Sequence, residues 1–175
     1  MKHLHVLCLI FILFIVPTGK GQSQEKETFK FSEKQIGIAA GMSTGFGLSY
    51  RQYINRYGFQ ICLAPIKDED NSLYSLGGTF LYKIKDADHI NFFLYQGNHF
   101  IYTESKGNYY DWNTMEQIYY KNVDREMVSS AGFGIEILMG NFVTTNLMTG
   151  FATFESYQRL SMTVEIGFFF RFKKN

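Results

Sequence analysis

The last stretch of the chain, residues Leu160 to Phe172, alternates between apolar and polar side chains. Its sequence is LSMTVEIGFFFRF, and every second residue from Leu160 onward is apolar. The intervening positions are mostly polar or small and include Glu165 and Arg171. Because successive side chains of a β-strand point to opposite faces, this pattern predicts a strand with one apolar and one polar face. Such a strand suits a soluble sandwich with its apolar face inward, or a membrane barrel with that face outward.

The same two-residue period recurs along the chain and predicts eight strands. We expect them at residues 35–41, 46–54, 57–64, 74–84, 90–102, 127–139, 142–154 and 160–172. Successive connections alternate in length: the short ones are 55–56, 85–88 and 140–141, and the longer polar ones are 65–72, 103–126 and 155–159. Short turns at one end and longer loops at the other are typical of an outer-membrane barrel. Only the turn at 43–45 is shorter than this pattern predicts, and we expect 103–126 to be the longest irregular loop.

The first 23 residues predict a cleaved signal peptide. Lys2 precedes an apolar run of about 13 residues, which Pro17 ends, and small residues follow it. This run is short for a membrane-spanning helix, which disfavours the alternative of an uncleaved anchor. No cysteine follows the run, so we do not expect a lipid anchor. We therefore divide the chain into a signal peptide at 1–23, a short periplasmic lead-in at 24–34 and a barrel domain at 35–175.

Composition favours an all-β exported domain. Aromatic residues make up 18% of the chain and only 2 residues are proline, which suits strands. Two of the 17 basic residues and none of the 16 acidic ones lie in the signal region, so the mature charge is −1, which argues against a nucleic-acid partner. Cys8 leaves with the signal peptide, and Cys62 then has no partner for an internal disulfide. A closed, hydrogen-bonded barrel in lipid needs none.

The signal peptide, the strand–turn rhythm over 35–172 and the closing VEIGFFFRF at 164–172 together resemble a known family. They resemble the small eight-stranded outer-membrane β-barrel proteins of Gram-negative bacteria, the OmpA/OmpX-like barrels. The resemblance implies an eight-stranded antiparallel up-and-down transmembrane β-barrel in the cell outer membrane, with membrane lipid and the insertion machinery as partners. It also implies a C-terminal assembly signal formed by Phe168, Phe170 and Phe172, which three further residues follow.

Charged residues lie on the polar side of several predicted strands. In a soluble sheet they would face water, whereas in an eight-stranded barrel they would face a lumen filled by side chains. Unpaired charges there would be costly, so we expect a barrel-interior charge network of Arg51, Glu136, Glu165 and Arg171. Glycines share this face and would make room for larger side chains; they are Gly37, Gly47, Gly58, Gly77, Gly132, Gly134 and Gly167. On the apolar face, we expect interfacial tyrosine girdles from Tyr50, Tyr57, Tyr74 and Tyr82.

The residues that carry enzyme or metal chemistry are few. The mature chain has two histidines, and His99 with Ser105 or Glu104 is the one conceivable pairing for a lipid-modifying enzyme. The acidic segment 68–71 lacks the glycine and the distant glutamate of a calcium loop. Cys62 lies among small residues and is predicted to be packed in the interior. We therefore predict no catalytic, metal-binding or cofactor-binding residue.

Function is expected to lie in the external loops. The loop at 103–126 offers a possible contact surface made of Tyr109, Tyr110, Trp112, Tyr119 and Tyr120. The alternative for this loop is packing on its own barrel rim. We predict a non-enzymatic outer-membrane protein with a structural or surface-interaction role. The alternatives are a narrow pore, a soluble exported barrel or sandwich that binds a small apolar ligand, and a lipid-modifying enzyme.

Overall fold

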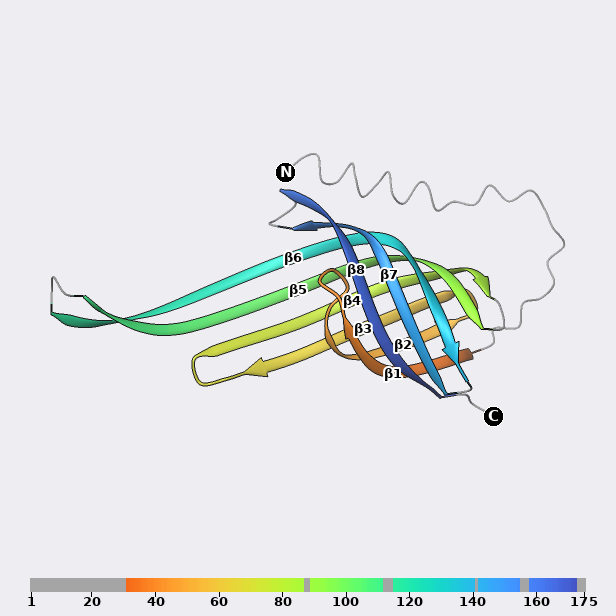
Figure 1. Ribbon diagram of the computed structural model, residues 1–175, viewed down its shortest axis with the longest axis horizontal. Helices are drawn as coiled ribbons and strands as arrows, with labels where there is room; N and C mark the ends of the chain where they lie inside the picture. Colours follow the sequence, from red (N-terminus) through yellow and green to blue (C-terminus); the bar gives the residue numbers. More distant parts are fainter. Residues whose placement is uncertain (1–30, 87–88, 112–114, 141, 155–157, 173–175) are drawn as a thin grey trace.

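The protein is an antiparallel β-barrel in which each strand pairs with its neighbours along the chain and the last strand pairs with the first (Figure 1). The computed structural model describes residues 31–86, 89–111, 115–140, 142–154 and 158–172. Its strands are β1 Phe31–Ala40, β2 Gly47–Ile54, β3 Tyr57–Lys67, β4 Asn71–Asp86, β5 Ile90–Asp111, β6 Glu116–Met139, β7 Val143–Phe154 and β8 Arg159–Phe172. The predicted signal peptide lies outside the described residues, and so does the lead-in up to residue 30.

Strand β8 closes the barrel against β1. Ile36 lies opposite Phe170, and Ile38 lies opposite Phe168, in an antiparallel ladder. Closure leaves the strands of the wall without a free edge, so their backbone N–H and C=O groups are bonded within the sheet. The prediction of an eight-stranded, up-and-down, all-β barrel is confirmed. No helix among the described residues is long and apolar enough to cross a membrane.

The apolar side of each strand faces outward. Leu48 and Val164 are 69% and 68% exposed, whereas Arg51 and Glu136 on the opposite face are 0% and 1% exposed. Each apolar Å² left in water costs about 25 cal/mol, and here the exposed apolar side chains extend around the whole wall. This exterior suits hydrocarbon, and a sandwich with its apolar face inward is wrong for this chain.

The outward set of β5 is not apparent from its sequence, because both sides of residues 90–95 are largely apolar. In the structure, Ile90, Phe92 and Leu94 face outward. Phe93 and Tyr95 are buried in the lumen, at 1% and 4% exposed. The register follows from pairing with β4 and β6, whose alternation is clear. Lumen-facing aromatic rings therefore share the interior with the charged residues.

The stretch 103–126 is not an irregular loop, so that prediction is wrong. It extends β5 and β6 into a long two-stranded ribbon whose last pairs are Tyr110 with Gln117 and Asp111 with Glu116. Strand β4 pairs with β5 only as far as Ser105, and β7 pairs with β6 only from Ser129. The ribbon therefore leaves the barrel and projects beyond it (Figure 1). Its residues lack alternation because neither face is buried, while its tyrosine, isoleucine and valine residues still favour strand.

The connection between β1 and β2, residues 41–46, folds into the lumen instead of away from it. Ser43 and Thr44 are 0% and 2% exposed. The backbone of this connection comes so close to β4 that a Cβ on Gly77 would lie 2.0 Å from the carbonyl oxygen of Thr44. This inward loop, drawn in orange in Figure 1, has six residues and is longer than the three-residue connection 68–70 at the same end, so the prediction of an unusually short turn at 43–45 is wrong. We call that end, from which the ribbon projects, the hairpin end, and the opposite one the turn end.

Candidate functional site

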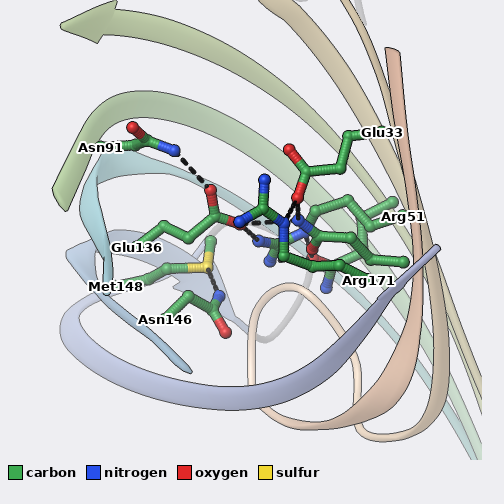
Figure 2. Close-up of polar contacts among 9 residues, drawn as sticks. Glu33, Arg51, Asn91, Glu136, Asn146, Met148 and Arg171 are labelled. Atoms are coloured by element: carbon green, nitrogen blue, oxygen red, sulfur yellow. Dashed lines mark hydrogen bonds and ion pairs between the residues drawn. The ribbon is translucent and has the colours of Figure 1, made fainter. Parts of the chain in front are cut away.

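The centre of the lumen holds a buried ion pair between β2 and β6. Arg51 Nη1 lies 3.3 Å from Glu136 Oε1, with the two side chains 0% and 1% exposed (Figure 2). Arg51 Nε donates to Gln60 Oε1 at 2.9 Å. The Glu136 carboxylate also accepts from Gln35 Nε2 at 3.0 Å and from Asn91 Nδ2 at 2.9 Å. Both charges are thus paired and further hydrogen-bonded, which is what a buried ion pair requires. We call these five residues the Arg51 cluster.

Aromatic rings enclose the same guanidinium. Its carbon lies 4.2 Å from the ring centroid of Phe169 and 5.9 Å from that of Phe93. A cation over a ring face is stabilised most where water is excluded. The predicted role of the inward glycines is visible here, since a Cβ on Gly134 would lie 2.4 Å from the Phe93 ring. Side chains therefore fill the lumen at the level of the Arg51 cluster.

Glu165 does not join the Arg51 cluster. Its carboxylate accepts a hydrogen bond from the backbone N–H of Ser43 at 3.0 Å and two more from the hydroxyls of Ser43 and Thr44. His99 holds the same loop through a bond of 2.8 Å between Nδ1 and the carbonyl oxygen of Met42. Because a carbonyl only accepts, Nδ1 donates this bond. Glu165 and His99 therefore fasten residues 41–46 inside the hairpin end of the lumen, and we call this arrangement the loop latch.

Arg171 lies at the turn end and pairs with Glu33 of β1, as Figure 2 shows. Gln35 Nε2 donates to Glu33 Oε1 at 3.1 Å as well as to Glu136, so Gln35 links this pair to the Arg51 cluster. The structure thus connects three of the four predicted network residues and places Glu165 elsewhere. Glu33 was missed because it falls in the expected lead-in. Its place on the same side of the strand as Gln35 was the signal that could have found it.

The histidine pairing considered for a lipid-modifying enzyme is absent from the described residues. His99 is fully buried, and its Nε2 lies 2.7 Å from Ser75 Oγ. Glu104 faces the outer surface instead, where its carboxylate binds two lysines. A serine beside a histidine has the reach of a nucleophile and its base. Here the other ring nitrogen of His99 is bonded to the backbone carbonyl of Met42, and Ser75 Oγ donates to the carbonyl of Phe46. Ser75 is 3% exposed beneath the inward loop, so the pair serves the loop latch.

The other two chemical candidates have local partners. Cys62 is buried, with its sulfur 3.2 Å from Gln60 Nε2 and 3.3 Å from Ser49 Oγ. In the turn at 68–71, the Asp68 carboxylate accepts from the backbone N–H of Glu69 at 2.8 Å. The described part of the chain contains no group of three or more His, Cys, Asp or Glu side chains placed to hold a metal ion.

The ribbon carries exposed tyrosines on both of its faces. Tyr109 and Tyr120 share one face with ring centroids 6.4 Å apart, and they are 54% and 50% exposed. Tyr110 and Tyr119 lie on the other face, at 46% and 74% exposed. These exposures show that the four rings do not pack on the barrel rim. Trp112, the fifth predicted contact residue, lies outside the described residues.

Paired tyrosines mark two levels of the outer wall. Tyr57 and Tyr82 lie near the turn end with ring centroids 5.4 Å apart. Tyr74 and Tyr102 lie near the hairpin end with centroids 5.9 Å apart. Tyrosine rings favour the two interfaces of a bilayer, because one end of the ring is apolar and the other is polar. The apolar outer wall lies between these levels, and Tyr102 adds a residue to the predicted girdle.

Charged residues surround Glu104 on the outer face, beyond the tyrosine pair Tyr74 and Tyr102 at the hairpin end. Glu104 Oε1 lies 3.3 Å from Lys106 Nζ and 3.0 Å from Lys121 Nζ. Tyr102 donates its hydroxyl to Glu104 Oε2 at 2.8 Å. The hydrogen bond from Tyr102, followed by those from the lysines, lowers the pKa of Glu104 from 4.5 to about 2. The carboxylate is therefore ionised at any physiological pH.

Comparison with known proteins finds similarity among solved structures. No family model and no curated protein sequence matches the chain. The chain is similar to the N-terminal β-barrel domain of Pseudomonas aeruginosa OprF, with a TM-score of 0.48 and 10% identity, covering 81% of this chain and 96% of that one. It is also similar to Neisserial surface protein A (NspA), with a TM-score of 0.40 and 14% identity, covering 82% and 94%. The architecture of this barrel is established by its own strand pairing and burial.

Proposed function

We propose that this protein is a non-enzymatic β-barrel of the outer membrane that does not conduct and that binds a partner through its projecting ribbon. The observation that carries the proposal is that the barrel is apolar outside and polar inside, the reverse of a soluble protein. A barrel of this kind reaches its lowest free energy with hydrocarbon around it. The predicted signal peptide supplies export, and Phe168, Phe170 and Phe172, which are 46%, 61% and 56% exposed on the outside of β8, are proposed as the signal for the insertion machinery.

The closed lumen supports a structural role over transport. An eight-stranded barrel is just wide enough for side chains to fill its interior. Here the Arg51 cluster occupies the middle, and the inward loop 41–46 occupies the hairpin end. An ion would have to displace both groups to pass. The lumen therefore acts as a packed core rather than as a channel.

The ribbon supports a binding role. Short turns are typical of the periplasmic side of an outer-membrane barrel, so the hairpin end faces the cell exterior in this proposal. Tyrosine is enriched at the centres of protein interfaces, because it buries a large area at little cost in conformational entropy. Tyr119, at 74% exposed, and its three neighbours present this chemistry on both faces of the ribbon.

Cell fractionation tests the location. We expect the protein in the outer-membrane fraction of a Gram-negative host and a change of its gel mobility between unboiled and boiled samples. Recovery from the soluble periplasmic fraction would overturn the membrane proposal. In planar bilayers the purified protein should give no steady conductance, and regular single-channel steps would instead establish the pore.

Site-specific crosslinking on intact cells tests the ribbon. A photoreactive residue at position 119 should form an adduct of defined mass, whereas one at the lipid-facing position of Phe133 should not form it. The matched control is a shortened chain in which an Asn-Gly turn joins Ser105 directly to Asn122, since these two residues are opposite each other in the ladder. That variant should still show heat-modifiable mobility but lose the partner. If no position from 106 to 121 gives an adduct, the binding role is contradicted.

A further inference from the structure

A hollow of about 500 Å³ lies on the outer wall at the hairpin end, across β3, β4 and β5. Its lining includes Lys67, Tyr74, Phe100, Glu104 and Lys106. The hollow arises because Ser72 is paired with Lys67 on one side and with Glu104 on the other, so a small side chain stands between two long ones. It faces the surroundings of the barrel and is separate from the lumen.

The face of the sheet that carries this hollow has an excess of positive charge. Lys67, Lys106, Lys121 and Arg125 share this face with the carboxylate of Glu104, and Asp70 lies beside Lys106, whose backbone N–H donates to the Asp70 carbonyl oxygen at 2.8 Å. Four basic residues against these two acidic ones leave an excess of two positive charges. Lys106 and Lys121 lie directly opposite each other, an arrangement that is unfavourable for like charges. Among the described residues, neither Lys67 nor Arg125 takes part in an ion pair, and Arg125 lies over the Tyr102 ring at 5.7 Å.

The nearby acidic residues offset this positive charge only in part. Asp124 is paired with Thr103 and Glu126 with Ile101, so both carboxylates point to the opposite face of the ribbon. Residues 68–70 form the acidic turn beyond Lys67, and Asp70 lies at the level of Lys106, one row beyond Lys67 and Glu104. Lys67 and Glu104 lie one row beyond the tyrosine pair Tyr74 and Tyr102, and Arg125 lies in the row of that pair.

The hollow borders directly on the apolar wall. Leu63, Leu76, Phe100 and Met127 lie side by side in one row across β3 to β6, and all four are exposed. The tyrosine pair Tyr74 and Tyr102 lies in the next row, and Lys67 and Glu104 lie in the row after that. Successive rows on one face are roughly 7 Å apart. A ligand that satisfies this surface therefore has an anionic group within about two rows, or roughly 14 Å, of a hydrocarbon part.

We infer that this hollow binds the phosphate headgroup of an anionic lipid in the outer leaflet, with the acyl chains lying against the apolar row. The inference rests on the proposed membrane location. Lys67 and Lys106, which line the hollow, contact the phosphate oxygens, and Lys121 and Arg125 add charge beside them. Basic side chains near a membrane surface each add a few-fold to the affinity for anionic lipid. Glu104 opposes the phosphate and holds Lys106 and Lys121 in place.

Lipid binding to the detergent-purified full-length protein, measured by native mass spectrometry, tests the site. The probes are a diphosphorylated lipid A, phosphatidylglycerol and phosphatidylcholine. We expect both anionic lipids to bind more tightly than phosphatidylcholine, and the triple variant Lys67→Gln/Lys106→Gln/Arg125→Gln to lose at least about tenfold in affinity for them. The control Lys85→Gln, an exposed lysine at the turn end, should bind as the parent does. Glu104→Gln should bind a few-fold more tightly.

The outcomes separate this site from the membrane proposal. Equal binding by the parent and the triple variant, or equal binding of phosphatidylcholine, would overturn the lipid site while the protein still fractionates with the outer membrane. Competition by millimolar inorganic phosphate as effective as that by lipid would assign the hollow to a free anion and also overturn it. Loss of heat-modifiable mobility in the parent would instead mean that the membrane proposal had failed.

Discussion

Strands β5 and β6 pass through two environments, and the same pair of strands follows different rules in each. Along the wall, residues 90–100 and 129–139 alternate between lumen and exterior, so that Asn91 is 2% exposed while its neighbour Phe92 is 46% exposed. In the ribbon, Tyr109 and Tyr110 are successive residues and both are about half exposed. Alternation therefore reports a difference between the two faces of a sheet and not the presence of the sheet itself.

The ion pairs of the two regions differ in the same way. Arg51 and Glu136 are enclosed, at 0% and 1% exposed, and each would be left as a buried charge without the other. Lys106 and Lys121 around Glu104 are 54% and 56% exposed, and water screens their attraction. The lumen pair therefore matters for folding. The ion pairs of Glu104 with Lys106 and Lys121 contribute little to stability, so residues on that surface can be substituted without unfolding the ribbon.

The largest expected effect follows from removing one half of the lumen pair. Glu136→Ala leaves the Arg51 guanidinium uncompensated and removes the acceptor for Gln35 and Asn91, so we expect a loss of about 3–5 kcal/mol in the free energy of unfolding. Urea titration in lipid vesicles, followed by the heat-modifiable band, measures it. The double variant Arg51→Met/Glu136→Met should recover most of the loss. A single variant as stable as the parent would show that the Arg51 cluster does not depend on charge pairing.

An intermediate effect is expected at the loop latch. Glu165→Ala leaves the buried N–H of Ser43 without its acceptor, which costs about 1–3 kcal/mol. We expect residues 41–46 to move more freely and intermittent conductance to appear in planar bilayers. Glu165→Gln keeps one acceptor oxygen and should conduct less, and Glu104→Gln on the outer wall serves as the control without conductance. A sealed Glu165→Ala barrel would mean that packing alone holds the loop.

The smallest expected effect is a change in the pKa of Glu104 on the ribbon. Because the pKa of Glu104 is lowered from 4.5 to about 2, its contacts favour the folded ribbon above pH 4.5, and this contribution is lost as the pH falls through about 2. Tyr102→Phe removes the largest cause of the lowered pKa, so the midpoint should rise toward 4.5. Side-chain carboxyl NMR shifts measure it. A parent midpoint near 4.5 would contradict the hydrogen bond from Tyr102.

The wall of the barrel could be predicted from the sequence because its signal is local. Each strand of the wall lies between an apolar exterior and the lumen, so every pair of successive residues records which face is which, as Glu165 and Ile166 do in β8. Tight connections such as 55–56 mark the ends. The ribbon was predicted as a loop because both of its faces are exposed to solvent, and a sheet with two solvent-exposed faces has no alternating pattern of apolar and polar residues.

The sequence by itself predicted a barrel of eight strands and, where the alternation is clear, which side chains lie inside it. Only the tertiary structure decided how those side chains meet. Arg51 and Glu136 are 85 residues apart and face each other because of the stagger of the strands around the barrel, which depends on all eight pairings together. Glu165 reaches Ser43, 122 residues away, because the β1–β2 loop turns inward. These contacts form only once the barrel has closed, and no short stretch of sequence encodes them.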